Sequence, residues 1–497
     1  MDTIIYETNA LSHWSRWQHI AYCSTAILYY ANQPGSHTPQ HRYFYPAYMA
    51  PIGVKVVEVC GMAPSPNSPE SPTHLCLPLT FFDALWLKFP PNQRLFFYEA
   101  SLPTPTLSSI IVPKLKHSLS LTLPHFLPLA GNLIWPPKSD HPIIHYSEGD
   151  SLSFTVAESE ADFYRLSGDD FREAEELHPF LPSLPSTDVR VPVMSLQVTL
   201  FPNKGFSIGY AVHHAVIDGK TTAMFFRSWV SICAGGSLEL DPVLDRTLIS
   251  DPFDLRRIYL NCWLDKNGAN NKSLVLWDLK TPPDTVLGTF RLTPANIETI
   301  KNSIQAQWKD KNPDKEAIRP STFTATSAYI WVCLVKARTA KTERVKLVIN
   351  VDCRARLDPP LPPSYFGNCV AGHFVNAKSK ELAGEDGVAM AAMGITEALA
   401  RLSDGVLEGA EDWVANLLTL QADIKFDSIA GSPRFELYRT DFGWGRPRKV
   451  EMVSNDKSGA FYLSDSRDGP GAIEVGVVLK KHEIDTFNSV FSSGLEA

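Results

Sequence analysis

The residues best suited to acid–base chemistry in this sequence are two adjacent histidines, His213 and His214, followed by Asp218 and Gly219. An imidazole exchanges a proton near neutral pH, so a histidine held at a strand end is suited to act as a general base. A carboxylate close by in sequence fits such a site, and a glycine lets the chain turn. The pattern therefore predicts a candidate proton-transfer site at the histidine pair.

The elements that would position these histidines are visible on either side of them. Two alternating apolar runs, residues 194–201 and 206–212, are separated by a Pro-Asn-Lys-Gly turn composition at residues 202–205. This arrangement predicts a β-hairpin whose second strand ends at the histidines. A helix is expected over residues 221–233, so its N-terminus would begin beside Asp218 and Gly219.

Three other interpretations of the same stretch compete with this one. In the first interpretation, both histidines are structural residues with their hydrogen bonds made inside the fold. It is favoured by the fact that an H-x-x-x-D pattern is short and recurs by chance. Ser207 stands in a G-x-S-x-G match, but it falls in the middle of a strand and the order of histidine and acid is wrong for a nucleophile elbow. Gly219-Lys220-Thr221 ends like a phosphate-binding loop, but the required earlier glycine is His214.

Bulk composition excludes several classes of function. The 497 residues are 44% hydrophobic and 20% charged, with a net charge of -8, which disfavours a nucleic-acid partner. The eight cysteines form no C-x-x-C pair and no Cys/His spacing typical of zinc, so no metal site is predicted. Scattered cysteines of this kind indicate free thiols in a reducing compartment.

The beginning of the chain differs from the rest. Residues 1–50 are rich in His, Tyr and Trp and lack a sustained period, so we expect a poorly ordered N-terminal extension; the alternative is a helix over residues 14–30. The apolar stretch at residues 20–31 is too short to span a bilayer, and no basic leader is present. These features predict a cytosolic protein without a membrane partner, and a monomer is expected.

Hydrophobic periodicity predicts a mixed α/β fold in two similar halves. Ile111, Leu115 and Leu119 lie on one helical face. An acidic helical piece is expected at residues 172–176, and the polar stretch at residues 234–273 would connect the halves. The expected strands cover residues 54–59, 95–98, 145–156, 288–292, 345–351, 461–463 and 473–479. The expected later helices cover residues 293–309, 321–338, 388–402 and 408–423, and a final helix carries Ile484, Phe487 and Phe491.

Three motifs together resemble those of a known family. HHAVIDG at residues 213–219 matches the HxxxD motif of the plant BAHD acyl-CoA-dependent acyltransferases, and DFGWG at residues 441–445 matches their second motif. YFGNC at residues 365–369 and the run at residues 77–98 resemble the branch that acylates anthocyanin and flavonoid glycosides. The resemblance covers residues 54–495.

This resemblance implies two domains similar to chloramphenicol acetyltransferase with a solvent channel between them. We expect an N-terminal domain over residues 51–250 that carries HxxxD and a C-terminal domain over residues 251–497 that carries YFGNC and DFGWG. Acyl-CoA would be a co-substrate that enters opposite the acceptor, and no permanently bound cofactor is implied.

The resemblance also assigns roles around HxxxD. His214 would be the general base, and His213 a structural residue. Asp218 would point away from the channel and pair with Arg354 or Arg356, bracing the catalytic loop. Gly219 would be needed for the turn.

Two interpretations of the second motif remain open. Trp444 either lines the acyl site or is the aromatic residue that Gly443 and Gly445 flank in a structural loop with Asp441. The cations that follow, Arg446, Arg448 and Lys449, either face the phosphates of coenzyme A or form a solvated basic patch.

The function predicted from these motifs is transfer of a malonyl or hydroxycinnamoyl group from acyl-CoA to a sugar hydroxyl of a phenolic glycoside. A peptide-synthetase condensation domain also carries HHxxxDG, but DFGWG fits it poorly. A catalytically silent, ligand-binding relative is the third hypothesis. The donor, the acceptor and the oxyanion-stabilising group stay open at the level of sequence.

Overall fold

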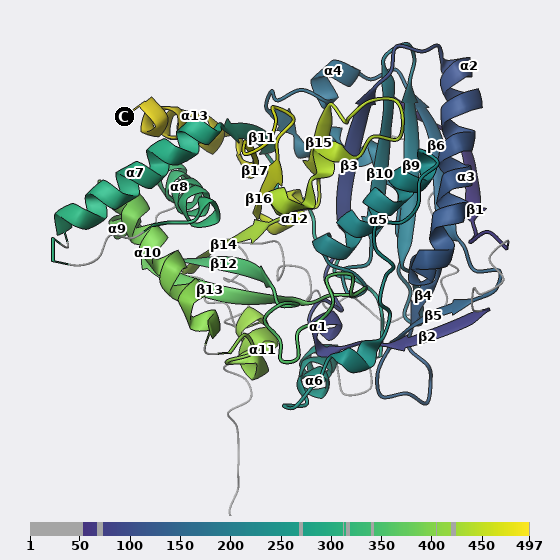
Figure 1. Ribbon diagram of the computed structural model, residues 1–497, viewed down its shortest axis with the longest axis horizontal. Helices are drawn as coiled ribbons and strands as arrows, with labels where there is room; N and C mark the ends of the chain where they lie inside the picture. Colours follow the sequence, from purple (N-terminus) through teal and green to yellow (C-terminus); the bar gives the residue numbers. More distant parts are fainter. Residues whose placement is uncertain are drawn as a thin grey trace, which may run out of the picture.

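The computed structural model describes residues 53–66, 73–267, 272–311, 313–314, 319–338, 342–403, 405–418 and 424–496. It contains two large β-sheets and one small sheet, with helices packed against them (Figure 1). Among the described helices, none combines the length and the apolar character that crossing a membrane requires.

The first large sheet has the strand order β1-β6-β9-β10-β3-β15. Its strands are β1 (Val54–Met62), β3 (Asn92–Glu99), β6 (Leu152–Ser159), β9 (Met194–Phe201), β10 (Gly205–Val212) and β15 (Lys449–Met452). β9 and β10 form the predicted antiparallel hairpin, and every side chain on both strands is buried. The hairpin therefore lies at the centre of the sheet, where the alternating apolar pattern places it.

The second large sheet has the order β13-β12-β14-β16-β17-β11-β7. Its strands are β7 (Arg172–Glu173), β11 (Thr285–Leu292), β12 (Arg344–Asp352), β13 (Val370–Lys378), β14 (Ile424–Ala430), β16 (Phe461–Asp465) and β17 (Ile473–Lys480). The small sheet, in the order β2-β5-β4-β8, consists of β2 (His74–Pro78), β4 (Asn132–Ile134), β5 (Ile143–Ser147) and β8 (Arg190–Pro192).

Helices cover the large sheets in two groups. α3 and α5 pack together in the first half, and α8 packs against α7, α10 and α13 in the second half. The α-helices are α1 (Phe81–Ala84), α2 (Thr104–Thr106), α3 (Val112–Thr122), α4 (Phe163–Leu166), α5 (Gly219–Cys233), α6 (Leu255–Asn267), α7 (Pro294–Lys311), α8 (Thr322–Ala337), α9 (Ser379–Leu382), α10 (Gly387–Ala400), α11 (Trp413–Leu418), α12 (Asn455–Ser458) and α13 (Lys481–Glu496). Shorter helical segments are η2 (Leu107–Ile111), η3 (Leu123–Ala130), η4 (Ala174–Glu176), η5 (His178–Phe180), η6 (Arg246–Leu248), η7 (Arg401–Ser403), η8 (Ala410–Asp412), η9 (Pro433–Phe435) and η10 (Leu437–Arg439).

The hydrophobic core runs through both halves without interruption. Trp229 of α5 and Trp331 of α8 belong to one buried cluster, and both side chains are inaccessible to solvent. Ile111 at the end of η2, together with Leu115 and Leu119 of α3, faces this core as the spacing predicts. A large continuous core fixes the two sheets relative to each other, which a site shared between them requires.

The structure confirms the mixed fold and most of the expected elements, with four corrections. Residues 145–156 are two strands, because Gly149 adopts a left-handed φ of 94° and turns the chain between them. Residues 172–176 begin as strand β7, because their backbone pairs with β11. The connection at residues 234–273 includes the helix α6, and the helix expected over residues 408–423 is η8 followed by α11. The predicted N-terminal extension and residues 419–423 lie outside the described residues.

Candidate active site

The histidine pair lies between the central strand β10 and the start of helix α5. The chain leaves β10 at His213, whose N–H donates to the carbonyl of Val193 at 2.8 Å. The loop ends at Asp218, the N-cap of α5, whose side chain accepts from the N–H of Thr221. Both ends of this loop are therefore fixed by hydrogen bonds to regular elements.

His213 is completely buried. Its Nδ1 accepts a hydrogen bond from the N–H of Ala215 at 3.1 Å. Burial lowers the pKa of His213 to about 3, with a smaller effect from the neighbouring His214. The ring is therefore neutral at physiological pH and contacts the loop rather than the solvent.

The ring of His214 lies in an aromatic environment. It stacks on Trp86 with ring centroids 4.1 Å apart and planes 9° from parallel, and Phe89 lies 6.1 Å away at a steep angle. Burial lowers the pKa of His214 to about 4, an effect that its own main-chain carbonyl and Asp218 only partly offset. Nδ1 is buried without a hydrogen-bond partner among the described residues, so no carboxylate is bonded to this ring nitrogen.

A cavity of about 1770 Å³ opens beside His214. Its walls come from both halves of the chain. The first half contributes Trp86 and His214, and the second contributes Asn350, Ser432 and Phe435. The His214 side chain is half-buried rather than sealed, so a ligand in the cavity can approach it.

Asn368 supports the backbone of His214 from the other half of the chain. Its amide nitrogen Nδ2 donates to the carbonyl of His214 at 2.9 Å and to Asp83 Oδ1 at 3.0 Å. The main-chain N–H of Asn368 also donates to Asp83 Oδ1, at 3.1 Å. One side chain thus joins the loop that carries His214 to helix α1.

Asp83 is the buried carboxylate at the centre of the hydrogen bonds that hold Asn368 against the backbone of His214. Its Oδ2 closes a capping box with Thr80 and lies 3.3 Å from Nη1 of Arg246. Arg246 Nη1 also donates to the hydroxyl of Tyr365 at 2.9 Å. α1 directly precedes Trp86, so the same network that holds Asn368 also orients the indole that stacks on His214.

Asp218 faces away from the His214 ring and pairs with Arg354. Arg354 Nη1 donates to Asp218 Oδ2 at 2.8 Å, and Nη2 donates to Oδ1 at 3.2 Å. The N–H of Cys369 donates to the same carboxylate at 3.1 Å. Burial would lower the pKa of Arg354, but the charge of Asp218 outweighs it and raises that pKa, so Arg354 stays protonated. The open choice between two arginines is thereby resolved.

Arg356, the other arginine expected near Asp218, is exposed and lines the cavity. It is one of nine Lys and Arg residues in the cavity wall, against five Asp and Glu residues. Several of these cations are already paired: Lys220 with Asp352, and Arg354 with Asp218. Arg356, Arg434 and Arg446 form no ion pair within the described part of the chain. Their charges can therefore bind an anionic ligand in the cavity.

The DFGWG loop is a turn that comes shortly before β15 of the first sheet. Asp441 Oδ1 accepts from the N–H groups of Gly443 and Gly445 at 2.8 and 2.9 Å. Both glycines have φ near 100°, a region that other residues rarely adopt. Phe442 is fully buried, with its ring edge against Trp229. Trp444 contacts Phe206 and Lys114 and is not part of the cavity wall, so the buried aromatic of the motif is Phe442 rather than Trp444.

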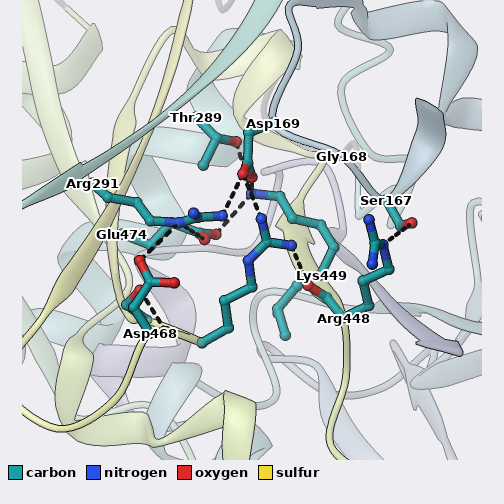
Figure 2. A network of polar contacts seen from close by, with 12 residues as sticks. Ser167, Gly168, Asp169, Thr289, Arg291, Arg448, Lys449, Asp468 and Glu474 are labelled. Carbon is teal, nitrogen blue, oxygen red and sulfur yellow. Dashed lines mark hydrogen bonds and ion pairs between the residues drawn. The ribbon is translucent and has the colours of Figure 1, made fainter. Parts of the chain in front are cut away.

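The three cations after DFGWG lie in three different environments, so neither of the two interpretations left open by the sequence holds for all of them. Arg446 lines the cavity. Arg448 donates to Ser167 at 3.1 Å and lies over the Tyr164 ring. Lys449 is completely buried and donates to Glu474 at 2.8 Å and to Thr289 at 2.7 Å (Figure 2). The prediction that Lys449 faces coenzyme A is therefore wrong, because its charge is already neutralised inside the protein.

Gly219 is required for a reason other than the predicted turn. It is the first residue of α5, and its backbone is outside the left-handed region. A Cβ at this position would lie 2.8 Å from Cε2 and 3.0 Å from Cζ of Phe435. The glycine therefore lets the helix start approach this ring of η9.

Sequence reasoning missed several residues that support the site. Trp86, Asp83 and Asn368 stand inside segments that carried the family resemblance, yet their spacing gave no indication of contact with His214. Arg246 lies in the polar connection, where nothing in the sequence distinguishes a buried cation from a solvated one. Only the tertiary arrangement brings these residues together.

Comparison with known proteins gives consistent matches over nearly the whole chain. A family model described as the Transferase family matches residues 61–493. Phenolic glucoside malonyltransferase 1 of Arabidopsis thaliana is 41% identical over 461 residues, covering 89% of this chain and 98% of the relative. Coumaroyl-CoA:anthocyanidin 3-O-glucoside-6''-O-coumaroyltransferase 2 of the same plant is 38% identical over 466 residues, covering 89% and 97%. The crystal structure of vinorine synthase has a TM-score of 0.66 at 21% identity and covers 87% of this chain and 96% of its own, which establishes the shared fold.

These findings define the protein as an acyl-CoA-dependent acyltransferase, with acyl-CoA as its co-substrate. The chain belongs to the Transferase family, the BAHD acyltransferases. The resemblance drawn from the three motifs is thereby confirmed.

Proposed function

We propose that this enzyme transfers a malonyl or hydroxycinnamoyl group from acyl-CoA to a sugar hydroxyl of a phenolic glycoside, with His214 as the general base. The relatives named for malonyl and coumaroyl transfer to glucosides support this substrate class. The observation that carries the proposal is that His214 stands in a cavity walled by both halves of the chain, with its ring held against Trp86.

The proton moves through Nε2 of His214, because Nδ1 is buried. Nε2 takes the proton of the sugar hydroxyl as the oxygen attacks the thioester carbonyl. The new C–O ester bond forms, the C–S bond breaks, and the departing thiolate recovers the proton from the imidazolium. This route needs no covalent acyl-enzyme and therefore no nucleophilic Ser or Cys.

The environment of His214 keeps it in the reactive form. With its pKa lowered to about 4, the ring is neutral at physiological pH and ready to accept a proton. Stacking on Trp86 and the Asn368 contact to its carbonyl limit its orientations. Holding donor and acceptor together in one cavity lowers the barrier by up to about 7–11 kcal/mol through positioning.

Arg356, Arg434 and Arg446 are the cations proposed to contact the anionic groups of the donor. They line the cavity, and they have no ion-pair partner among the described residues. An arginine fork binds phosphate or carboxylate through two parallel hydrogen bonds. They are therefore suited to the phosphates of coenzyme A and, when the donor is malonyl-CoA, to the free carboxylate as well.

We further propose that the chain divides near residue 250 into two acyltransferase domains, and that the enzyme is a cytosolic monomer. The two large sheets, each formed mainly by one side of that boundary, support the division. Size-exclusion chromatography with light scattering and imaging of a fluorescent fusion test the last two points; a dimer mass or an organellar signal would contradict them.

The function is tested with malonyl-CoA and coumaroyl-CoA, each incubated with a phenolic glucoside and a thiol reagent that reports free coenzyme A. We expect acceptor-dependent thiol release by the wild type and an acylated glucoside by mass spectrometry. His214→Ala should lose nearly all of this activity, whereas His117→Ala, an exposed histidine on α3, should retain it. Equal rates for the wild type and His214→Ala would reject the proposal.

A further inference from the structure

Three residues with side chains that bind metals meet on the outer face of the small sheet. His74 and Cys76 belong to β2, and His145 belongs to the neighbouring strand β5. One ligand atom from each of these residues lies within 4.8 Å of the others. The mechanism derived above uses none of them.

The strand register explains why they meet. Cys76 pairs directly with His145, and His74 pairs with Ser147 two positions away, so all four side chains point to the same face. The alternate residues Leu77, Ile144 and Tyr146 point to the opposite face and are buried in the core. The trio is thus fixed on a rigid, packed sheet while its ligand atoms face the solvent.

The contacts within the trio already resemble those around a metal. Cys76 Sγ lies 3.1 Å from His74 Nε2, and the rings of His74 and His145 are 4.9 Å apart in an edge-on arrangement. Nδ1 of His74 lies 3.3 Å from the hydroxyl of Ser147. When Nδ1 donates to that hydroxyl, Nε2 keeps its lone pair, which is how outer partners usually orient a metal-ligating histidine.

We propose that His74, Cys76 and His145 form a binding site for a transition-metal ion of the zinc type. Zinc–sulfur and zinc–nitrogen bonds of about 2.3 and 2.0–2.1 Å place neighbouring ligand atoms of a tetrahedral site roughly 3.3–3.8 Å apart. The ligand atoms here lie within 4.8 Å of one another, so binding an ion requires the widest separations to shorten by about 1 Å. One thiolate and two imidazoles select zinc over magnesium or calcium, which prefer oxygen ligands.

Three protein ligands leave the fourth position open. Solvent, or a ligand from outside the chain, would complete the coordination. Spacing rules did not predict this site because the ligands come from two strands about 70 positions apart and form no compact Cys/His motif. A bound ion would also add a side-chain link between the paired strands β2 and β5. β2 is followed along the chain by α1 and Trp86.

The test titrates the purified, tag-free and metal-free enzyme with Zn²⁺ by calorimetry, and with Co²⁺ by absorption spectroscopy. We expect one additional equivalent bound by the wild type compared with Cys76→Ser or His145→Ala. Co²⁺ should give a thiolate charge-transfer band that is absent from Cys76→Ser. Residues 1–50 also contain histidines and Cys23, so the difference between variants decides, rather than the total bound.

Two matched variants and a folding control complete the design. Cys60→Ser and His117→Ala remove a cysteine and a histidine elsewhere in the first half and should bind Zn²⁺ as the wild type does. All variants should keep the wild-type acyl transfer rate without metal, which shows that they are folded. Zn²⁺ should raise the Tm of the wild type more than that of Cys76→Ser. Identical stoichiometry and identical cobalt spectra for the wild type, Cys76→Ser and His145→Ala would overturn the proposal.

Discussion

At the scale of single residues, His214 combines accessibility with a strongly reduced affinity for protons. Its ring faces the cavity on one edge, while Trp86 and Phe89 cover it and remove water. Desolvation disfavours the charged imidazolium, which explains the lowered pKa of about 4. The same contacts that orient the His214 ring therefore also keep it unprotonated.

This arrangement predicts the pH dependence of the reaction. The acidic limb of kcat/KM reports protonation of the base in the free enzyme. For the wild type we expect its midpoint near pH 4, well below the ordinary histidine value of 6.5, because the base is lost only when the pH falls through its lowered pKa. Initial rates measured across the acidic range, with either acyl-CoA donor, check this expectation.

The matched variant for this experiment is Trp86→Ala. Removing the stacked indole admits water beside the ring, so the midpoint should rise toward 6.5 in addition to any loss of rate. Preincubation at each pH followed by assay at neutral pH separates protonation from irreversible unfolding. A wild-type midpoint near 6.5 would contradict the role of desolvation.

At the scale of elements, the strand, loop and helix around HxxxD were predictable because their patterns are local. The hairpin turn, the buried strands and the start of α5 follow from alternation, turn residues and an N-cap acid. β15 was not predictable: Lys449 and Glu451 look solvated in the sequence, yet both are buried and neutralised by distant residues. Side-chain contacts of this kind leave no periodicity to detect, and the same holds for the contact of Asn368 with the carbonyl of His214.

Gly219 provides a test at the junction of α5 and η9. Alanine would normally favour a helix over glycine, but its Cβ would lie 2.8 Å from the Phe435 ring. Overpacking of this kind costs about 1–3 kcal/mol. Gly219→Ala should therefore lower the free energy of unfolding by that amount, measured by urea denaturation.

Introducing Gly219→Ala into a Phe435→Leu variant separates steric overcrowding from other causes of destabilisation. Phe435→Leu removes the ring atoms that the new Cβ would meet, so Gly219→Ala should be nearly neutral or slightly stabilising in that background. The difference between the two backgrounds is the coupling energy of the pair. An equal loss in both backgrounds would show that Phe435 is not the reason for the glycine.

At the scale of the whole molecule, the ion pair of Asp218 and Arg354 connects the two halves at the site. Asp218 caps α5 of the first half, and Arg354 follows β12 of the second half. Asp218→Ala should lower stability by about 3–5 kcal/mol, because it removes the buried carboxylate and leaves the guanidinium only the partly exposed Asp352, 2.9 Å away. Turnover should fall as well, since the loop that carries His214 ends at this residue; thermal unfolding and kcat measured on the same preparation check both.

Asp218→Asn is the control variant that separates loss of the charge from loss of the helix cap. Asparagine keeps an acceptor for the N–H of Thr221 and nearly the same volume, so the helix cap survives while the charge is lost. It should destabilise the protein less than alanine does. If Asp218→Asn and Asp218→Ala both kept wild-type stability and turnover, the bracing role of the pair would be refuted.

The two large sheets also exchange strands, which binds the halves together. β15, from late in the chain, pairs with β3 in the first sheet, and β7, from early in the chain, pairs with β11 in the second. Between them lies a network in which Arg291 and Arg467 contact Asp169, and Lys449 contacts Glu474 (Figure 2). This network therefore links β15 of the first sheet to β11 and β17 of the second.

Lys449→Met tests whether this network holds the halves together. Lys449 on β15 is completely buried, 2.8 Å from Glu474 on β17 and 3.6 Å from Asp169. Methionine preserves much of the apolar stem but leaves these carboxylates without that cation, so we expect a loss of about 3–5 kcal/mol in the free energy of unfolding. The neighbouring Arg448→Met removes a partly exposed pair with Glu99 and should cost about 1 kcal/mol or less. Adding Glu474→Gln to Lys449→Met should restore part of the loss, because without Lys449 the charge of Glu474 is offset only by Arg291, 3.7 Å away. Equal urea midpoints for Lys449→Met and Arg448→Met would show that the buried contact contributes nothing special to the joining of the sheets.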